Sequence, residues 1–387
     1  MLGEDTTYRE QLTYLSDSDR TLGYTHLDGI EGCEAYDARL TLTEAADGGT
    51  AVLWSATISA EATRLGPICE GTRAVYQAGI AALAGEVLAR EKERELEGKK
   101  FHPMQQFTVL PKLPLTTVIL DDLLRLALTV TPPKPGPLCL FLHGIGGARG
   151  NWDGQLAAVA PVMRAAALDL RGYGASHLGP HQSTVDDYCA DILRVAAHLG
   201  ADKLVLVGLS YGSWLATSFA MRHPGRLAGL VLSGGCTGMS EAAPTERAAF
   251  RTARETPLNA GQTPADFAPA VVNVIAGPHT TAKTRATLLQ SMQAIPTATY
   301  RDALTCFTTP PECFDFAKLT MPVLMMTGEY DRLAPPSEIR GVALRIAANP
   351  GADVQYETIP AAGHVCNIEQ PTLYNRPLLA FLQRIAQ

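Results

Sequence analysis

The sequence predicts an α/β fold with one large buried sheet, preceded by a smaller α+β segment. Apolar runs at 138–142, 204–207 and 323–327 each end at a glycine-containing turn, which is typical of buried strands. The first hundred or so residues have a different pattern, alternating apolar and polar side chains before changing to helical spacing. The chain has 387 residues, which is more than a single hydrophobic core usually organises, so two domains are expected.

The most informative segment is the apolar run at 204–207, which continues directly into Gly208-Leu209-Ser210-Tyr211-Gly212. A strand that passes straight into a helix places the intervening side chain on a sharp, exposed turn. The two glycines permit that turn, because a Cβ at either position would crowd the strand against the helix. Glycine is abundant, 34 of 387 residues, so the interpretation of this motif depends on the segments around it.

Three further strand ends supply the groups that a nucleophilic serine needs. A serine hydroxyl requires a base, and the base requires a carboxylate to hold its tautomer. The glycine-rich loop at 143–147 is the expected source of a backbone N–H for an oxyanion hole. Downstream, the strand near 323–327 leads to Asp331, and an extended segment leads to His364. The chain order is therefore oxyanion loop, serine, acid, histidine.

These segments resemble the α/β-hydrolase fold superfamily over roughly 111–387, and within it the enol-lactonase, esterase and perhydrolase group. The motifs that carry the resemblance are 143–147, 169–176, 208–212, 328–331 and 363–364. The resemblance implies Ser210 as nucleophile, Asp331 as the orienting acid and His364 as the base. It also implies an oxyanion hole formed by the backbone N–H groups of Ile145 and Tyr211.

Several of these assignments have alternatives. Glu329 could replace Asp331, although the resemblance places the acid at the last residue of the Gly-x-x-Asp turn. His143 could be catalytic, but in this loop we expect it to hydrogen-bond the backbone. Asp169 and Arg171 are expected to brace a loop near the strand ends rather than to react.

A serine nucleophile supports acyl transfer, whereas dehalogenation in this superfamily needs an aspartate at the same turn. Ester, lactone and thioester hydrolysis, perhydrolysis and carbon–carbon bond hydrolysis therefore stay open. The alternative class is a non-catalytic protein that binds an apolar ligand and keeps a relic triad. No metal-ligand cluster is visible, so no metal or cofactor is expected.

The insertion at about 237–318, with helical stretches at 246–254 and 282–294, is the expected lid over Ser210. Its apolar residues suggest an acyl or aromatic pocket, although most of them must also pack the lid helices. They are Phe250, Phe267, Val271, Val272, Val274, Ile275, Leu288, Leu289, Met292 and Phe307. Its arginines could clamp a substrate carboxylate or could simply be solvated, and the sequence does not choose among Arg247, Arg251, Arg254, Arg285 and Arg301.

The amino-terminal segment reads as an antiparallel hairpin over 36–43 and 52–58, followed after Pro67 by a long helix. The expected helical stripe is Tyr76, Ile80, Leu83 and Val87. The segment resembles part of a Bet v 1-like domain of the polyketide cyclase and START-related superfamily, without that domain's opening strand and helix pair. A complete domain of this kind would hold an apolar ligand between sheet and helix.

The expected organisation is this α+β segment at 1–96, a linker at 97–112 and the hydrolase domain at 113–387. The apolar face of the shortened segment should contact the hydrolase body or a second chain, which makes a homo-oligomer one expectation.

Charge and cysteine usage limit the expected partners and compartment. The net charge of −7 and pI near 5.7 disfavour nucleic acid as a partner, since no basic excess can neutralise phosphates. No signal-like or membrane-spanning apolar run is visible, so no membrane association is expected. The eight cysteines are dispersed without a Cys-x-x-Cys pair and are expected to be reduced, buried thiols of a cytoplasmic protein acting on a small acyl substrate.

Overall fold

The computed structural model describes residues 9–16, 20–28, 30–44, 50–98, 115–311 and 313–386. They belong to two compact units, Met1–Glu91 and Lys92–Gln387. The predicted linker at 97–112 lies outside the described residues apart from its first two positions, which are the last two of a long helix that begins in the first unit and ends at Gly98.

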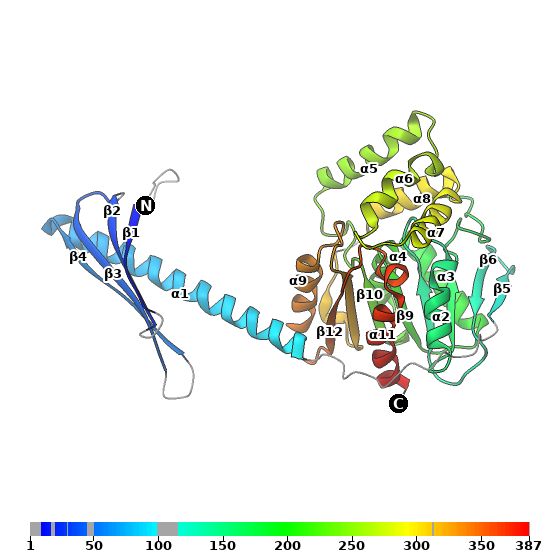
Figure 1. The fold of residues 1–387 in the computed structure, drawn as a ribbon, viewed down its shortest axis with the longest axis horizontal. Coiled ribbons are helices and arrows are strands. Elements are labelled where there is room, and N and C mark those ends of the chain that lie inside the picture. The colour runs from blue at the N-terminus through cyan, green and yellow to red at the C-terminus, as the bar shows by residue number, and fades with distance from the viewer. Residues whose placement is uncertain are drawn as a thin grey trace. The chain divides into compact units, whose positions relative to one another are not determined.

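The second unit is built on an eight-stranded sheet in the order β12-β11-β10-β9-β7-β8-β6-β5 (Figure 1). The strands from β12 to β8 are parallel to their neighbours, while β6 runs antiparallel to β8 and β5 antiparallel to β6. Their bounds are β5 Thr116–Leu120, β6 Leu126–Val130, β7 Leu138–Leu142, β8 Ala165–Leu168, β9 Leu204–Leu209, β10 Leu227–Ser233, β11 Val323–Gly328 and β12 Val354–Ile359. The predicted α/β class is confirmed.

Helices cover both faces of this sheet, and the side chains of β9 show why. Leu204 and Leu206 belong to the core shared with α3, α4 and α9, whereas Val205 and Val207 belong to the core shared with α2 and α11. Successive side chains of a strand point to opposite faces, so a strand buried on both sides is apolar throughout. The helices are α2 Asp153–Val159, α3 Val185–His198, α4 Tyr211–Arg222, α9 Pro336–Ala347, α10 Cys366–Glu369 and α11 Pro371–Ala386.

Four helices lie between β10 and β11 in the sequence, within the predicted lid. They are α5 Pro244–Asn259, α6 Pro264–Ile275, α7 Ala282–Gln293 and α8 Thr297–Thr308. Figure 1 shows them together above one end of the sheet, the end at which the parallel strands finish. Short 3₁₀ turns occur at η1 Arg149–Trp152, η2 Pro224–Arg226 and η3 Phe316–Lys318.

The first unit pairs a four-stranded antiparallel sheet, in the order β1-β2-β3-β4, with one long helix. The elements are β1 Arg9–Ser16, β2 Thr21–Asp28, β3 Cys33–Glu44, β4 Thr50–Ala60 and α1 Ala62–Gly98. Along β4, odd-numbered residues from 51 to 59 are exposed and even-numbered ones are partly buried. The predicted hairpin with one apolar face is thus confirmed, and β1 and β2 extend it.

The apolar face of this sheet packs against α1 through aromatic side chains. The Trp54 ring stacks on Tyr76 with centroids 4.5 Å apart, and the Tyr36 and Tyr76 hydroxyls are 2.6 Å apart. A Cβ added at Gly79 would lie 2.5 Å from the Trp54 ring, so the helix approaches the sheet closely at this glycine. Ile80, the next residue of the predicted stripe, is partly buried, and the side chains of Leu83 and Val87 lie outside the described residues.

The predicted start of α1 after Pro67 is wrong, because the helix begins at Ala62. The N–H groups of Arg64 and Leu65 both donate to the Glu61 carbonyl, which closes the first turn before the proline. Pro67 then costs one hydrogen bond in the second turn, and its fixed φ is compatible with a helix.

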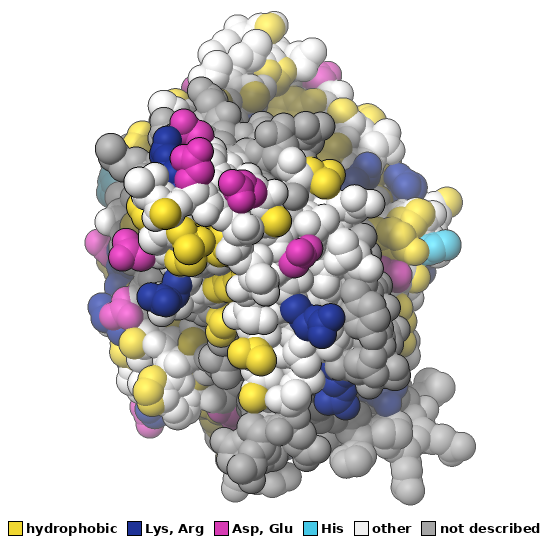
Figure 2. All heavy atoms as spheres, turned by 90° about the vertical axis from the view of Figure 1, so that its left-hand side faces the viewer, with side chains coloured by type: hydrophobic (Ala, Val, Ile, Leu, Met, Phe, Trp, Pro, Cys, Tyr) yellow, Lys and Arg dark blue, Asp and Glu magenta, His cyan; other side chains and the backbone are white. Residues whose placement is uncertain are grey.

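Apolar side chains also face outward on the described part of this unit. Leu53 is 64% exposed and Val75 50% exposed. Figure 2 shows hydrophobic side chains scattered among charged and neutral ones over one face of the protein. Single exposed apolar side chains of this kind are ordinary for a protein surface.

Candidate active site

Ser210 occupies the turn between β9 and α4 with a backbone that few residues other than glycine adopt. Its φ is 55° and its ψ is −116°, a strained combination that costs roughly 1–3 kcal/mol. A Cβ at Gly208 would lie 2.4 Å from the Gly212 carbonyl oxygen, and one at Gly212 would lie 2.2 Å from the Leu142 carbonyl oxygen. The predicted need for both glycines is therefore confirmed by geometry.

Asp331 and His364 meet at the ends of the neighbouring strands β11 and β12. The His364 Nδ1 lies 2.9 Å from Oδ2 of Asp331. The other oxygen, Oδ1, accepts hydrogen bonds from the N–H groups of Leu333 at 2.9 Å and Ala334 at 3.0 Å. Burial acts to raise the pKa of Asp331, but the opposite charge of His364 and these hydrogen bonds outweigh it and lower that pKa. The group is therefore a carboxylate at neutral pH.

Glu329, the alternative acid, does not contact the histidine. Its side chain is exposed, and its Oε2 accepts a hydrogen bond from the Ala361 N–H at 2.9 Å. The structure thus brings Asp331, rather than Glu329, against His364.

The backbone around His364 is fixed by contacts with the lid. Its N–H donates to the carbonyl of Ile275, the last residue of α6, at 2.8 Å. Glu369 accepts hydrogen bonds from the N–H of Gly363 at 3.0 Å and from that of Gly277 at 2.7 Å, and also from the Thr280 hydroxyl. One buried carboxylate therefore joins the histidine loop to the segment between α6 and α7.

The loop at 143–147 is held by His143 and Tyr173. The His143 Nδ1 donates to the Gly144 carbonyl at 2.8 Å, and its Nε2 accepts from the Leu170 N–H at 3.1 Å. Burial lowers the pKa of this imidazole, so it stays neutral with both nitrogens engaged. The Tyr173 hydroxyl donates to the Ile145 carbonyl at 3.0 Å. His143 hydrogen-bonds the loop backbone, as predicted.

This loop also lies directly against the serine. A Cβ at Gly144 would be 3.3 Å from Cβ of Ser210. Ile145, Tyr211, Ser210 and His364 all line one cavity of about 580 Å³. The two residues predicted to supply oxyanion N–H groups and the two predicted to react therefore face the same space.

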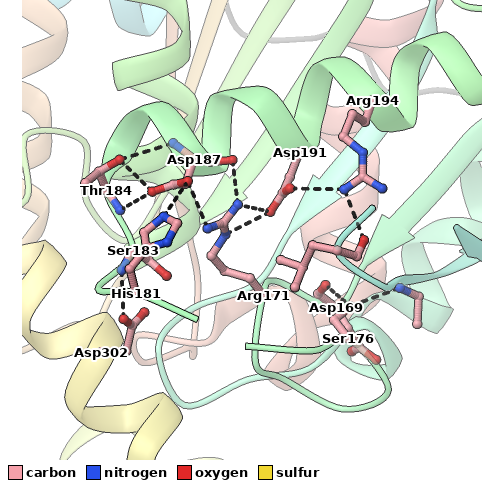
Figure 3. Close-up of polar contacts among 12 residues, drawn as sticks. Asp169, Arg171, Ser176, His181, Ser183, Thr184, Asp187, Asp191, Arg194 and Asp302 are labelled. Carbon is pink, nitrogen blue, oxygen red and sulfur yellow. Dashed lines mark hydrogen bonds and ion pairs between the residues drawn. The ribbon is translucent and has the colours of Figure 1, made fainter. Parts of the chain in front are cut away.

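A polar network braces the adjacent loop, as predicted for Asp169 and Arg171 (Figure 3). Asp169 accepts hydrogen bonds from the Arg149 N–H at 2.9 Å and the Ala175 N–H at 3.1 Å. Arg171 donates from Nε to Asp191 of α3 at 2.9 Å and from Nη2 to the Asp187 carbonyl at 2.9 Å. These groups connect the loop after β8 to α3 and to the 3₁₀ turn η1, which follows the oxyanion loop.

The cavity wall is mostly apolar and comes largely from the lid. Among the described residues, the predicted pocket members that line it are Phe250, Phe267, Val271, Val274, Ile275, Leu288, Met292 and Phe307. Val272 and Leu289, also expected there, instead pack into the hydrophobic core. Of the five lid arginines, Arg254 alone lines the cavity, and Tyr300 and Glu338 join it without having been predicted.

Within the described residues, no group of three or more His, Cys, Asp or Glu side chains is arranged to hold a metal ion. The same part of the chain contains no helix long and apolar enough to cross a membrane.

The chain belongs to the alpha/beta hydrolase fold family, whose model matches residues 137–371, more than half of its length. Two curated hydrolases match over shorter stretches. The chain is 35% identical over 103 residues to epoxide hydrolase B of Mycobacterium tuberculosis, covering 26% of this chain and 29% of the relative. It is 34% identical over 116 residues to epoxide hydrolase 4 of Mus musculus, covering 30% and 32%. The aligned stretches thus span about a third of these relatives.

Solved structures match over about two thirds or more of the chain. A malate-bound thermophilic esterase from Thermogutta terrifontis superposes with a TM-score of 0.61 at 25% identity, covering 71% of this chain and all of that one. The enol-lactonase from Burkholderia xenovorans LB400 superposes with a TM-score of 0.54 at 21% identity, covering 67% and 96%, which shows a shared fold. The family and the hydrolase-named relatives support a hydrolase.

Proposed function

We propose that this protein is a serine hydrolase that cleaves an ester, lactone or related acyl substrate through an acyl-enzyme. Ser210 is the nucleophile, His364 the base and Asp331 the acid that orients it. The observation that carries the proposal is the 2.9 Å contact between His364 and a buried carboxylate, beside a cavity that the strained Ser210 also lines. A nucleophile, a base and an orienting acid are the groups that acyl transfer requires, which supports the proposal.

Each residue has a step in the proposed reaction. The Asp331 carboxylate fixes the Nδ1–H tautomer of His364, which leaves Nε2 free to take the Ser210 proton. The serine oxygen then attacks the substrate carbonyl, and the N–H groups of Ile145 and Tyr211 stabilise the oxyanion that forms. His364 returns the proton to the leaving oxygen, and water releases the acyl group by the same steps in reverse order.

The same chemistry disfavours epoxide opening, despite the names of some relatives. Attack of a serine oxygen on an epoxide carbon would produce an alkyl ether, which water and a histidine cannot hydrolyse. Attack on a carbonyl produces an ester, which they can. Perhydrolysis and carbon–carbon bond hydrolysis would use the same triad, and a panel of acyl substrates separates them from ester and lactone cleavage.

A fluorophosphonate probe tests the proposal against a protein with a relic triad. We expect the wild type to be labelled at Ser210 and the Ser210→Ala variant to be unlabelled. The control is Ser337→Ala, which removes an exposed hydroxyl at the start of α9. A folded wild-type protein that is not labelled, and that hydrolyses no ester or lactone of graded acyl length, would contradict the proposal.

For the amino-terminal unit, the partial Bet v 1-like segment at 1–96, we propose a stabilising role rather than ligand binding. The stacked Trp54 and Tyr76 rings and the close approach at Gly79 fill the space between β4 and α1 where a ligand would lie. The hydrolase domain at 113–387, with its lid at 237–318, would then contain all of the chemistry.

We further propose that the protein acts in the cytoplasm. All eight cysteines are unpaired, and five of them are buried. Cys313 is exposed, contrary to the expectation of uniformly buried thiols, and an exposed unpaired thiol persists most readily in a reducing compartment.

A further inference from the structure

Arg254 places an uncompensated positive charge in the wall of the candidate active site. It lies on α5, half-buried, with its guanidinium carbon 3.3 Å from the centre of the Phe250 ring. Its Nη1 donates to the Phe250 carbonyl at 3.2 Å, and within the described residues no carboxylate forms an ion pair with it. Arg251, one turn earlier on the same helix, is instead paired with Glu255 at 2.7 Å.

Tyr300 on α8 adds a second unused donor to the same wall. Its side chain is 5% exposed, and its hydroxyl has no hydrogen-bond partner among the residues that the structure describes. Unlike the hydroxyls of Tyr188 and Tyr211, which are fully buried without a partner, the Tyr300 hydroxyl keeps access to the cavity, where water or a ligand can accept its hydrogen bond. Burial raises the pKa of Tyr300 although the nearby Arg254 charge lowers it, so the phenol keeps its proton and can donate.

The helix that carries Tyr300 is fixed to the body of the second unit. The neighbouring Thr299 hydroxyl donates to the Gly172 carbonyl at 2.9 Å. Two residues further on, Asp302 accepts a hydrogen bond from the Ser183 N–H at 2.8 Å, which Figure 3 shows at the end of the polar network. The phenol is therefore held in place before any ligand binds, which reduces the entropy cost of using it.

Glu338, the acidic side chain of the cavity wall, does not neutralise Arg254. Its pKa is raised by burial and then by the negative charges of Asp331 and Glu241, so it lies on the side of the triad acid. Arg254 instead interacts electrostatically with Tyr300. The lid side of the cavity thus carries the positive charge of Arg254, and it offers hydrogen-bond donors from the Arg254 guanidinium and the Tyr300 hydroxyl.

We propose that Arg254 and Tyr300 form a carboxylate-binding subsite, so that the substrate is an acyl compound with a carboxylate remote from the scissile bond. A planar guanidinium matches a carboxylate through parallel hydrogen bonds, and the phenol supplies a further donor. The same cavity is lined mostly by apolar side chains, which would pack against the carbon chain or ring that joins the two ends of such a substrate. The inference rests on the proposed acyl hydrolysis and specifies its substrate class.

Paired esters of equal length test the subsite. Each pair consists of the mono-4-nitrophenyl ester of a dicarboxylic acid, such as glutaric or adipic acid, and the same ester with a terminal carboxamide. We expect the wild type to prefer the acid. Arg254→Gln should lower the acid-to-amide ratio of kcat/KM by about 10–100-fold, the range for a charged hydrogen bond, while the amide ester changes little. Arg254→Lys should keep part of the preference.

Two further variants separate this role from a general effect on the lid. Tyr300→Phe should lower the ratio by about 2–10-fold, as expected for a neutral hydrogen bond. Arg251→Gln is the matched control, since it removes a positive charge from the same helix outside the cavity wall, and it should leave the ratio unchanged.

The outcomes distinguish the subsite from the triad. If Ser210 is labelled by fluorophosphonate but wild type and Arg254→Gln show the same acid-to-amide ratio, the subsite is wrong and the hydrolase proposal stands. If Ser210 is not labelled and neither ester is cleaved, the hydrolase proposal is wrong. Calorimetric binding of adipate to the wild type then decides the subsite, since loss of binding in Arg254→Gln supports it and equal binding overturns it.

Discussion

Replacing Asp331 by asparagine tests how the triad depends on the geometry of one carboxylate. The Oδ1 atom accepts two backbone N–H groups, at 2.9 and 3.0 Å, so the asparagine oxygen has a strong reason to occupy that position. Its amide nitrogen then faces Nδ1 of His364, at the place where the carboxylate oxygen lay 2.9 Å away. Two donors cannot share one hydrogen bond, so His364 must change to the tautomer that carries its proton on Nε2.

That tautomer cannot accept the serine proton, which sets the size of the expected effect. A triad with the wrong histidine tautomer loses about 10⁴ in kcat, or about 5.5 kcal/mol of transition-state stabilisation. The backbone hydrogen bonds survive, so the variant should fold like the wild type. Steady-state hydrolysis of the best ester, with circular dichroism as a check on folding, measures the effect.

The matched control for this variant is Glu329→Gln, which removes a carboxylate from the same turn without touching His364. It should keep activity within about threefold of the wild type. Activity within tenfold of the wild type in Asp331→Asn, together with a large loss in Glu329→Gln, would refute the reasoning and transfer the orienting role to Glu329.

Four other predictions follow from the described contacts. His143 is buried with a lowered pKa, so its neutral form stabilises the fold above the ordinary imidazole pKa of 6.5, and this stabilisation is lost as the pH falls below that value. Between pH 6.5 and 5, the free energy of unfolding of the wild type should therefore fall by up to about 1.4 kcal/mol per pH unit more than that of His143→Gln. Thermal melts measure both slopes, and equal slopes would contradict this prediction. Gly79→Ala should destabilise the first unit by about 1–3 kcal/mol because its Cβ would meet Trp54, whereas Gly71→Ala, with open space around it, should be neutral or stabilising in the same thermal melt. A chain that begins at Phe101 should still react with fluorophosphonate; a folded version that does not react would place part of the active site in the first unit. Ester hydrolysis should be unaffected by EDTA, and a loss that zinc restores would show a metal requirement.

The strand-to-helix turn at Ser210 was predictable because its constraints are local. Clashes at Gly208 and Gly212 are with backbone atoms of adjoining elements, so the motif itself encodes the turn. The fold class was predictable for a related reason, since β9 is apolar on both faces and must be covered on both sides. The residues alone could not decide which carboxylate orients His364. Glu329 and Asp331 are two residues apart, and only the direction of the turn decides which one faces the histidine.

The substrate side of the cavity could not be predicted in this way. Five lid arginines look alike in the sequence, and only the packing of α5 onto α8 places Arg254 in the wall while Arg251 pairs with Glu255. Tyr300 gives no sequence signal, because a tyrosine on a helix is ordinarily a packing residue. The start of α1 was predicted wrongly because a proline often marks a helix boundary. Here the first turn of the helix closes before Pro67, through the hydrogen bonds to the Glu61 carbonyl.

The carboxylate of Glu369 has a consequence for how the cavity opens. Because it ties Gly277 to Gly363, any displacement of the segment between α6 and α7 would drag the histidine loop out of position. Helix α8 is similarly restrained, with seven of its residues buried, whereas α5 buries Leu258 alone. Among the four lid helices, α5 therefore has the fewest buried side chains. Because α5 also carries Arg254, we expect access to the cavity and selection by charge to depend on the same element.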